Sequence, residues 1–296
     1  MLKRLLTILI CLLMLAGSAL ADSVKLPIDF SGGTRLRPKM FNGMESYEDP
    51  TISVVIETGF LDDFTQTQWW SATIKIGDAS QLRTVAAESF DTNSVWPGKE
   101  LAKEVNAVVA INGDYYNYFR GRGLVIRQAI TYIDNLQGLR DILQIDEDGD
   151  FHLIRRANVG DAGKEINGKL VINSFFFGPA LVIDGVATTD WKQNEWRDMA
   201  RDARSARMAL CQIGPLEYKV ICCSAMNRKG KGMTLETFAN FCQSQGAIQA
   251  YNLDGGDSTM LYFHGELVND VPAERQRDLM DIVYFASAWN GKSKQE

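Results

Sequence analysis

The chain has 296 residues, of which 46% are hydrophobic and 10% aromatic, and its formal net charge is −6. A composition this apolar can bury a large core, which excludes a disordered chain. Because the protein is acidic and has no long basic run, nucleic acid and anionic membranes are poor partners.

The N-terminus has the three parts of a secretory signal peptide. Lys3 and Arg4 precede an apolar run over residues 5–15, and small residues ending in Ala21 follow. We therefore predict a signal peptide over residues 1–21. The apolar run is too short for a permanent membrane anchor. The mature protein is expected to be secreted, periplasmic or in the cell envelope, with no stable anchor.

The next segment, residues 22–49, has no clear period and predicts an extended N-terminal arm. A strand-like pattern follows, with strands predicted over residues 52–57, 70–76 and 84–87. No Pro- or Ser-rich linker divides the rest of the chain. We therefore predict one domain over residues 50–290.

Two segments share one design, in which a helix leads into a buried strand and then into a polar turn. The first unit has a predicted helix over 99–106, a strand over 107–111 and the turn Asn112-Gly113-Asp114. The second has a predicted helix over 234–245, a strand over 247–251 and a turn that Asn252 opens. We expect two similar halves whose turns meet at one site. The predicted fold is α+β, a single domain with mixed β-sheets and a few packed helices.

The region between these two units predicts mainly hairpins. The strand pairs are 143–146 with 151–154, 173–177 with 181–185, and 206–213 with 218–225. A charged helix is predicted over 190–204. The acidic turn before Phe151 resembles a calcium loop, but Phe151 stands where an EF-hand needs glycine. A solvated turn is therefore the better interpretation.

Four cysteines lie beyond the predicted signal peptide, at Cys211, Cys222, Cys223 and Cys242. An exported protein can pair them in disulfides. All four also lie in apolar segments, where cysteine packs as a small core residue. The sequence leaves both alternatives open.

The segment over residues 252–260, Asn-Leu-Asp-Gly-Gly-Asp-Ser-Thr-Met, is the strongest candidate for a site. A glycine pair lets the backbone turn sharply and lets a ligand approach. An ordinary Asp-Gly hairpin turn is the alternative. Since the turn at 112–114 has the same character, we predict that Asp254, Asp114 and Asp257 supply catalytic carboxylates.

Several other chemistries are disfavoured. The chain has two histidines and lacks a Gly-x-Ser-x-Gly elbow, a His-Glu-x-x-His motif and paired Cys-x-x-Cys motifs. Gly121-Arg122-Gly123 lacks the third glycine of a dinucleotide loop. We expect no cofactor, and the sequence does not decide whether a metal binds.

Two arginines are candidates for binding an anion. Arg207 lies on an otherwise apolar predicted strand, where a guanidinium is costly unless it meets an anion, and its fork suits a phosphate. An internal salt bridge is the alternative interpretation. Arg277 follows the last predicted hairpin.

These motifs, in this order, resemble the phosphodiester glycosidase family over roughly residues 105–285. The likeness is carried by these segments: residues 110–116 (AINGDYY), 178–185 (GPALVIDG), 206–209 (ARMA), 232–235 (GMTL), 252–260, and Val268-Asn269 with Arg277. The resemblance implies hydrolysis of a sugar-1-phosphodiester, in the cell envelope or in exopolysaccharide, with a sugar-phosphate or glycan as substrate.

By match to the family motifs, the resemblance assigns a substrate-binding role to a set of turn residues and to the two arginines. The set is Asn112, Gly113, Arg207, Asn252, Gly255, Gly256, Ser258, Thr259 and Arg277. Asp114 and Asp257 stand where the family often has glycine, so which carboxylate acts is open. Asp254 matches the usual pattern and is favoured.

Two other hypotheses fit the same residues. A carbohydrate-binding envelope protein would keep the pocket without catalysis, and an ordinary glycosidase would use a pair of carboxylates. The sugar, the anomer, the acceptor and the oligomeric state are not encoded in any recognisable motif.

Overall fold

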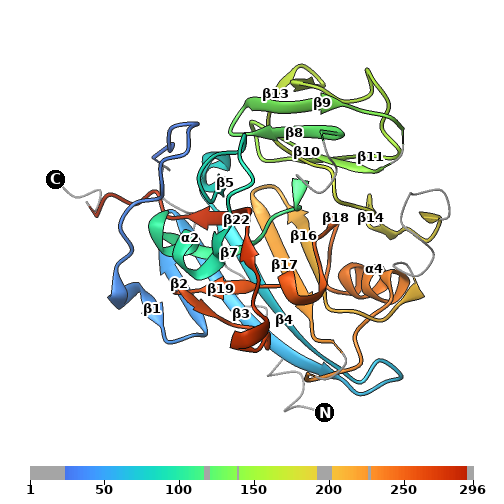
Figure 1. The fold of residues 1–296 in the computed structure, drawn as a ribbon. Helices are drawn as coiled ribbons and strands as arrows, with labels where there is room; N and C mark the ends of the chain where they lie inside the picture. Colours follow the sequence, from blue (N-terminus) through green and yellow to red (C-terminus); the bar gives the residue numbers. More distant parts are fainter. Residues whose placement is uncertain (1–23, 117–120, 139, 192–201, 226–227, 292–296) are drawn as a thin grey trace, which may run out of the picture.

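The structure is a computed structural model that describes residues 24–291 apart from 117–120, 139, 192–201 and 226–227 (Figure 1). The predicted signal peptide and most of the predicted helix over 190–204 lie outside the described residues. Among the described residues, three main antiparallel sheets and two α-helices form the fold.

The largest sheet has nine strands. Their spatial order is β1 (Phe41–Asn42), β2 (Ser46–Asp49), β3 (Ile52–Leu61), β4 (Thr67–Ile76), β17 (Glu217–Cys223), β16 (Arg207–Gly214), β18 (Gln249–Leu253), β14 (Ala180–Ile183) and β15 (Val186–Ala187). The long β3–β4 and β16–β17 hairpins form its middle. The β16–β17 hairpin was predicted, whereas β3 and β4 were predicted only as strands. The last residues of the predicted N-terminal arm do not stand apart from the domain. They form β1 and β2, which pair at the edge of this sheet.

The second sheet has five strands and faces the first. Its order is β20 (Glu266–Leu267), β19 (Leu261–Phe263), β7 (Ala107–Asn112), β22 (Asp281–Ala286) and β5 (Leu82–Ala86). Apolar side chains of both sheets, such as Val54, Leu210, Ile111 and Phe285, form one buried cluster. The largest core therefore lies between the two sheets.

The two helices cover the outer faces of these sheets. Helix α2 (Gly98–Glu104) packs on β7 and β22, and α4 (Leu235–Ser244) packs on β14 and β16. The Thr234 hydroxyl accepts a hydrogen bond from the Thr237 N–H, so it caps α4. The order of layers is helix, sheet, sheet, helix.

A third sheet stands to one side of this sandwich, at the top of Figure 1. It contains β11 (Phe151–Ile154), β10 (Ile142–Asp146), β13 (Lys169–Phe175), β8 (Gly123–Arg127) and β9 (Ile130–Asn135), and β12 (Glu165–Ile166) pairs with β13. A two-stranded ribbon joins β21 (Asp278–Leu279) to β6 (Trp96–Pro97). Two carboxylates at the acidic turn between β10 and β11 pair with Lys169, which begins β13. Lys169 Nζ lies 2.9 Å from Asp148 and 3.3 Å from Asp146.

One part of the predicted fold needs correction. Every pairing between named strands of the described chain is antiparallel, so the prediction of mixed sheets was wrong. The α+β class is consistent with the structure, in which strands dominate because most apolar runs are short and joined by hairpin turns. The four cysteines are buried and free, which answers the disulfide question in this structure.

Candidate functional site

The two helix-strand-turn units meet, as predicted, although their strands belong to different sheets. Asn112 is the last residue of β7, and its side-chain amide donates hydrogen bonds to the Asp254 carbonyl (2.9 Å) and to the Gly113 carbonyl (3.1 Å). Its Oδ1 accepts a hydrogen bond from the Met260 N–H (3.2 Å). One buried amide therefore ties the ends of β7 and β18 together.

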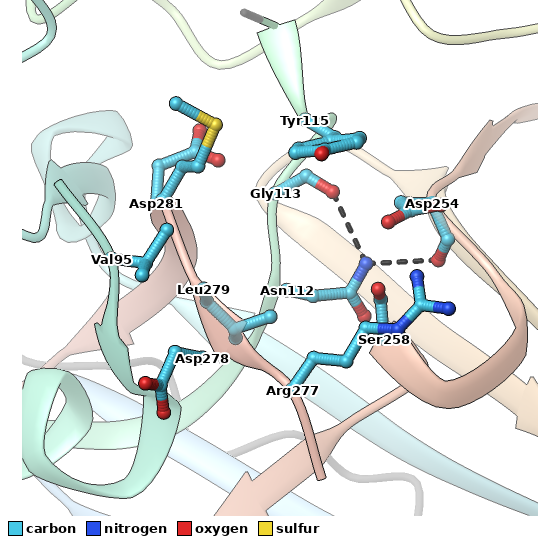
Figure 2. Close-up of a pocket in the computed structure, with 11 residues that line it drawn as sticks. Val95, Asn112, Gly113, Tyr115, Asp254, Ser258, Arg277, Asp278, Leu279 and Asp281 are labelled. Carbon is cyan, nitrogen blue, oxygen red and sulfur yellow. Dashed lines mark hydrogen bonds between the residues drawn. The ribbon is translucent and has the colours of Figure 1, made fainter. Parts of the chain in front are cut away.

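A cavity of about 120 Å³ opens beside this junction (Figure 2). Its polar lining combines the predicted residues Asn112, Gly113, Asp254, Ser258 and Arg277. The remaining walls come from Val95, Tyr115 and the segment over residues 278–281. Residues far apart in the sequence thus converge on one polar hollow.

Asp254 is the predicted carboxylate that this cavity exposes. Burial raises the pKa of its carboxyl above the usual value, and hydrogen bonds from the Ser258 hydroxyl and the Gly255 N–H oppose that rise. The positive charge of Arg277 opposes it further. The net effect is a raised pKa, which makes this carboxylate a better proton acceptor than an exposed aspartate.

The glycine pair next to Asp254 is required by close packing and by the turn. A Cβ on Gly255 would lie 2.7 Å from the Ala206 carbonyl oxygen, which is too close for any real side chain. Gly256 has φ +63°, in the left-handed region that favours glycine, and it opens the short 3₁₀ turn η5 (Gly256–Ser258). The turn therefore brings the Asp254 backbone against β16.

A second cavity of about 160 Å³ lies on the other side of Asp254. Apolar residues such as Phe177, Pro179 and Leu235 form most of it, and Asn252 and Arg207 contribute polar groups. The Asn252 amide nitrogen donates to the Gly178 carbonyl (2.8 Å). Asn252 Oδ1 is buried and has no hydrogen-bond partner among the described residues.

Arg207, a predicted phosphate ligand, lies beside the second cavity, and its guanidinium donates hydrogen bonds to backbone oxygens. Nε donates to the Met233 carbonyl (3.1 Å) and Nη2 to the Ala203 carbonyl (2.8 Å). Burial lowers the pKa of the guanidinium. The guanidinium therefore braces the loop that precedes β16, and Arg277 is the better placed of the two arginines to meet a phosphate in the first cavity.

Asp114 does not line either cavity, contrary to its predicted catalytic role. Its side chain is fully buried, with one oxygen 2.8 Å from Arg127 Nη2 and the other accepting the Phe176 N–H (2.9 Å). Sequence spacing could not show this, because Arg127 arrives from β8 of the third sheet. The carboxylate is used to join sheets.

Asp257 and Thr259 also turn away from the two cavities. The Asp257 carboxylate pairs with the buried Arg228 and, at 2.9 Å, with the exposed Arg275. Thr259 is fully buried, and its hydroxyl has no hydrogen-bond partner among the described residues. Their neighbours Asp254 and Ser258 face the first cavity instead.

Asp281 is a cavity carboxyl that the sequence analysis missed. It begins β22, is 2% exposed, and lies 3.4 Å from Arg127 Nη2. Burial raises the pKa of Asp281 to about 7, and the charges of Asp114 and Asp254 contribute to the rise while Arg127 opposes it. The only sequence signal was an acid directly before the apolar run over residues 282–286.

The described residues contain no group of three or more His, Cys, Asp or Glu side chains that could hold a metal ion. Within the same residues, no helix is both long and apolar enough to cross a membrane.

An antiparallel sandwich with a carboxylate, an amide and an arginine around one hollow defines a protein with a site for a small polar ligand. The model of the phosphodiester glycosidase family matches residues 105–286, which is more than half of the chain. The chain therefore belongs to the phosphodiester glycosidase family, as the sequence motifs indicated. Family and fold together support a hydrolase of the phosphodiester glycosidase type.

Known proteins similar to this chain include one curated relative and several solved structures. The zebrafish N-acetylglucosamine-1-phosphodiester alpha-N-acetylglucosaminidase catalytic domain, auto-inhibited by its pro-peptide, superposes with a TM-score of 0.65 at 17% identity, covering 81% of this chain and 85% of that one. A hypothetical protein from Synechocystis gives a TM-score of 0.52 at 16% identity, covering 79% of this chain and 62% of that one.

The curated relative is the SPbeta prophage-derived uncharacterized protein YomE of Bacillus subtilis (strain 168). It is 25% identical over 193 residues, which is 62% of this chain but 28% of YomE. The chain thus corresponds to little more than a quarter of that protein. At these identities the structural likeness defines the fold alone.

Proposed function

We propose that this protein is an exported hydrolase that cleaves the bond between the anomeric carbon of a sugar and a phosphodiester oxygen, in a glycan of the cell envelope or exopolysaccharide. The observation that carries the proposal is the junction of Asn112 with Asp254 beside one cavity that Arg277 also lines. Membership of the phosphodiester glycosidase family supports the reaction class.

The chemistry follows from these positions. Asp254 accepts a proton from a water molecule whose oxygen forms a bond to the anomeric carbon. The bond from that carbon to the phosphate oxygen breaks, and the electron pair stays on the phosphate. The products are the free sugar and a phosphomonoester. Arg277 stabilises the charge that grows on the departing phosphate.

The two cavities on either side of Asp254 suit the two parts of such a substrate. The first contains Arg277 and is polar, which favours the phosphate and the reacting bond. The second has apolar walls with one unpartnered acceptor, Asn252 Oδ1, which favours a group with an apolar face and a hydroxyl or amide donor. Both cavities share Asp254, which supports a scissile bond beside this carboxylate.

A panel of sugar-1-phosphodiesters and UDP-sugars, assayed for released reducing sugar with and without a chelator, tests the proposal. Asp254→Asn should lower kcat by about 10²–10⁴-fold while the circular dichroism spectrum stays unchanged, since the isosteric amide cannot accept the proton. Asp134→Asn, at an exposed carboxylate on β9, is the matched control and should leave the rate unchanged. Full activity of Asp254→Asn would remove Asp254 from the mechanism.

A carbohydrate-binding protein without catalysis is the second candidate. Two of the three predicted carboxylates, Asp114 and Asp257, are committed to ion pairs, and this observation favours it. Binding of a sugar phosphodiester in calorimetry, with no product from any member of the panel, would identify this alternative.

A further inference from the structure

Two further carboxyls line the first cavity beside Asp254: Asp278, which is exposed, and Asp281, which is buried. The surroundings of Asp281 differ from those of Asp254. Asp281 and Asp254 both line the cavity, and Figure 2 draws them on either side of Gly113. A Cβ on Gly113 would overlap the Asp281 carboxylate, so the absence of a side chain at 113 makes room for it. Asp281 is therefore packed directly against the turn that holds Asn112.

The charged groups around Asp281 come from three different parts of the fold. Arg127 reaches it from β8, with Nη2 3.4 Å from Oδ2, and the same Nη2 lies 2.8 Å from Asp114. Asp254 approaches from the end of β18. Burial raises the pKa of the neighbouring Tyr116 hydroxyl, and the charge of Asp281 adds to that rise. One guanidinium thus serves two buried carboxyls, so their charges would not be balanced if both were ionised.

We infer that Asp281 is the proton donor of this site, acting on the departing phosphate oxygen while Asp254 activates water on the other side of the bond. The inference rests on the proposed function. As the bond to the anomeric carbon breaks, the Asp281 proton moves to the phosphate oxygen. The water proton goes to Asp254, and exchange with solvent in the open cavity returns both carboxyls to their starting forms.

The protonation states suit this division of work. Burial and two anionic neighbours keep Asp281 protonated to near neutral pH, whereas hydrogen bonds and Arg277 favour the ionised form of Asp254. A phosphomonoester has a second pKa of about 6. An acid whose own pKa is about 7 can therefore pass its proton to the leaving group with little change in free energy.

A structural role for Asp281, as a mere partner of Arg127, predicts a different response to the leaving group. The test compares Asp281→Asn with the unaltered protein on two substrates of one sugar, the phosphodiester and the glycosyl fluoride. Fluoride departs without a proton from the enzyme. We expect kcat/KM to fall about 10²-fold on the phosphodiester and less than about threefold on the fluoride. In the unaltered protein, activity should fall as pH rises above about 7, because Asp281 then loses its proton. In Asp281→Asn this fall should be absent.

Equal losses on both substrates would overturn the role of Asp281 and leave the proposed function intact. If the unaltered protein turned over neither the phosphodiester nor the fluoride, the proposed function would be overturned together with this role. Asp134→Asn, an exposed carboxylate outside the cavity, should show neither change.

A second variant tests the inference if Asp281→Asn does not fold. Asp114→Asn removes an anion that raises the Asp281 pKa. The decline of activity at alkaline pH should therefore move to lower pH, while the amide oxygen of the new side chain can still accept from Arg127 or from the Phe176 N–H. An unchanged pH profile in a folded Asp114→Asn protein would overturn the inference.

Discussion

Arg127 is the buried cation on which both the fold and the site depend, and Arg127→Met tests that dependence. The side chain is fully buried, pairs with Asp114 at 2.8 Å and with Asp281 at 3.4 Å, and stacks 4.4 Å from the Phe175 ring centroid. Methionine has a similar length and is apolar. The substitution therefore removes the charge while it preserves much of the packing.

The expected cost follows from leaving two carboxyls buried without their cation. Removing one partner of a buried ion pair typically costs about 3–5 kcal/mol. For a protein of this size, Tm changes by roughly 2–4 °C per kcal/mol. We expect Arg127→Met to lower the Tm at pH 8 by roughly 6–20 °C.

The loss should depend on pH in a defined direction. In the folded protein the pKa of Asp281 is raised above its ordinary value, and removal of Arg127 raises it further. A raised carboxyl pKa means that the folded state binds a proton more tightly than the unfolded state, so stability is present at low pH and is lost as pH rises through the folded pKa. The difference between variant and unaltered protein should therefore grow from pH 5 to pH 8.

Thermal unfolding followed by circular dichroism at several pH values measures both effects. Arg83→Met is the matched control, because Arg83 is equally buried but donates mainly to backbone oxygens of Pro27 and Ser31 and to one half-exposed carboxylate, that of Asp29. Its loss of stability should change little with pH. If the loss in Arg127→Met were as insensitive to pH as that in Arg83→Met, the argument about the two carboxyls would be refuted.

Two further substitutions test the site itself. Gly113→Ala should lower the free energy of unfolding by about 1–3 kcal/mol in urea and also reduce turnover, since the added Cβ must displace the Asp281 carboxyl. Gly163→Ala is the control, because a Cβ there meets nothing within 4 Å. An equal effect at both positions would contradict the prediction. Arg277→Gln should raise KM for a sugar phosphodiester by about tenfold or more in initial-rate assays, because a charge-assisted hydrogen bond contributes about 1.5–3 kcal/mol. Arg35→Gln, at an exposed arginine, is the control and should leave KM unchanged. An unaltered KM in Arg277→Gln would exclude a phosphate contact.

Local pattern was sufficient for the parts of the protein that depend on neighbours in the chain. The buried strand before Asn112, the helix capped by Thr234 and the β16–β17 hairpin follow from apolar periodicity and capping, which act over a few residues. The approach of Asn112 to Asp254 was also predictable, because the same helix-strand-turn design occurs twice. Family motifs read from these segments identified the reaction class.

Only the tertiary structure decided which acids face the cavity. Asp114 lies in a polar turn after a strand and Asp281 begins a strand, and both contact Arg127, yet only Asp281 lines the cavity. Arg127 lies on a sheet that no local pattern joins to the β7 turn, and the charge that a carboxyl meets depends on such long-range packing. Sequence determined the turns and the candidate residues, whereas three-dimensional neighbours determined the protonation and the role of each carboxyl.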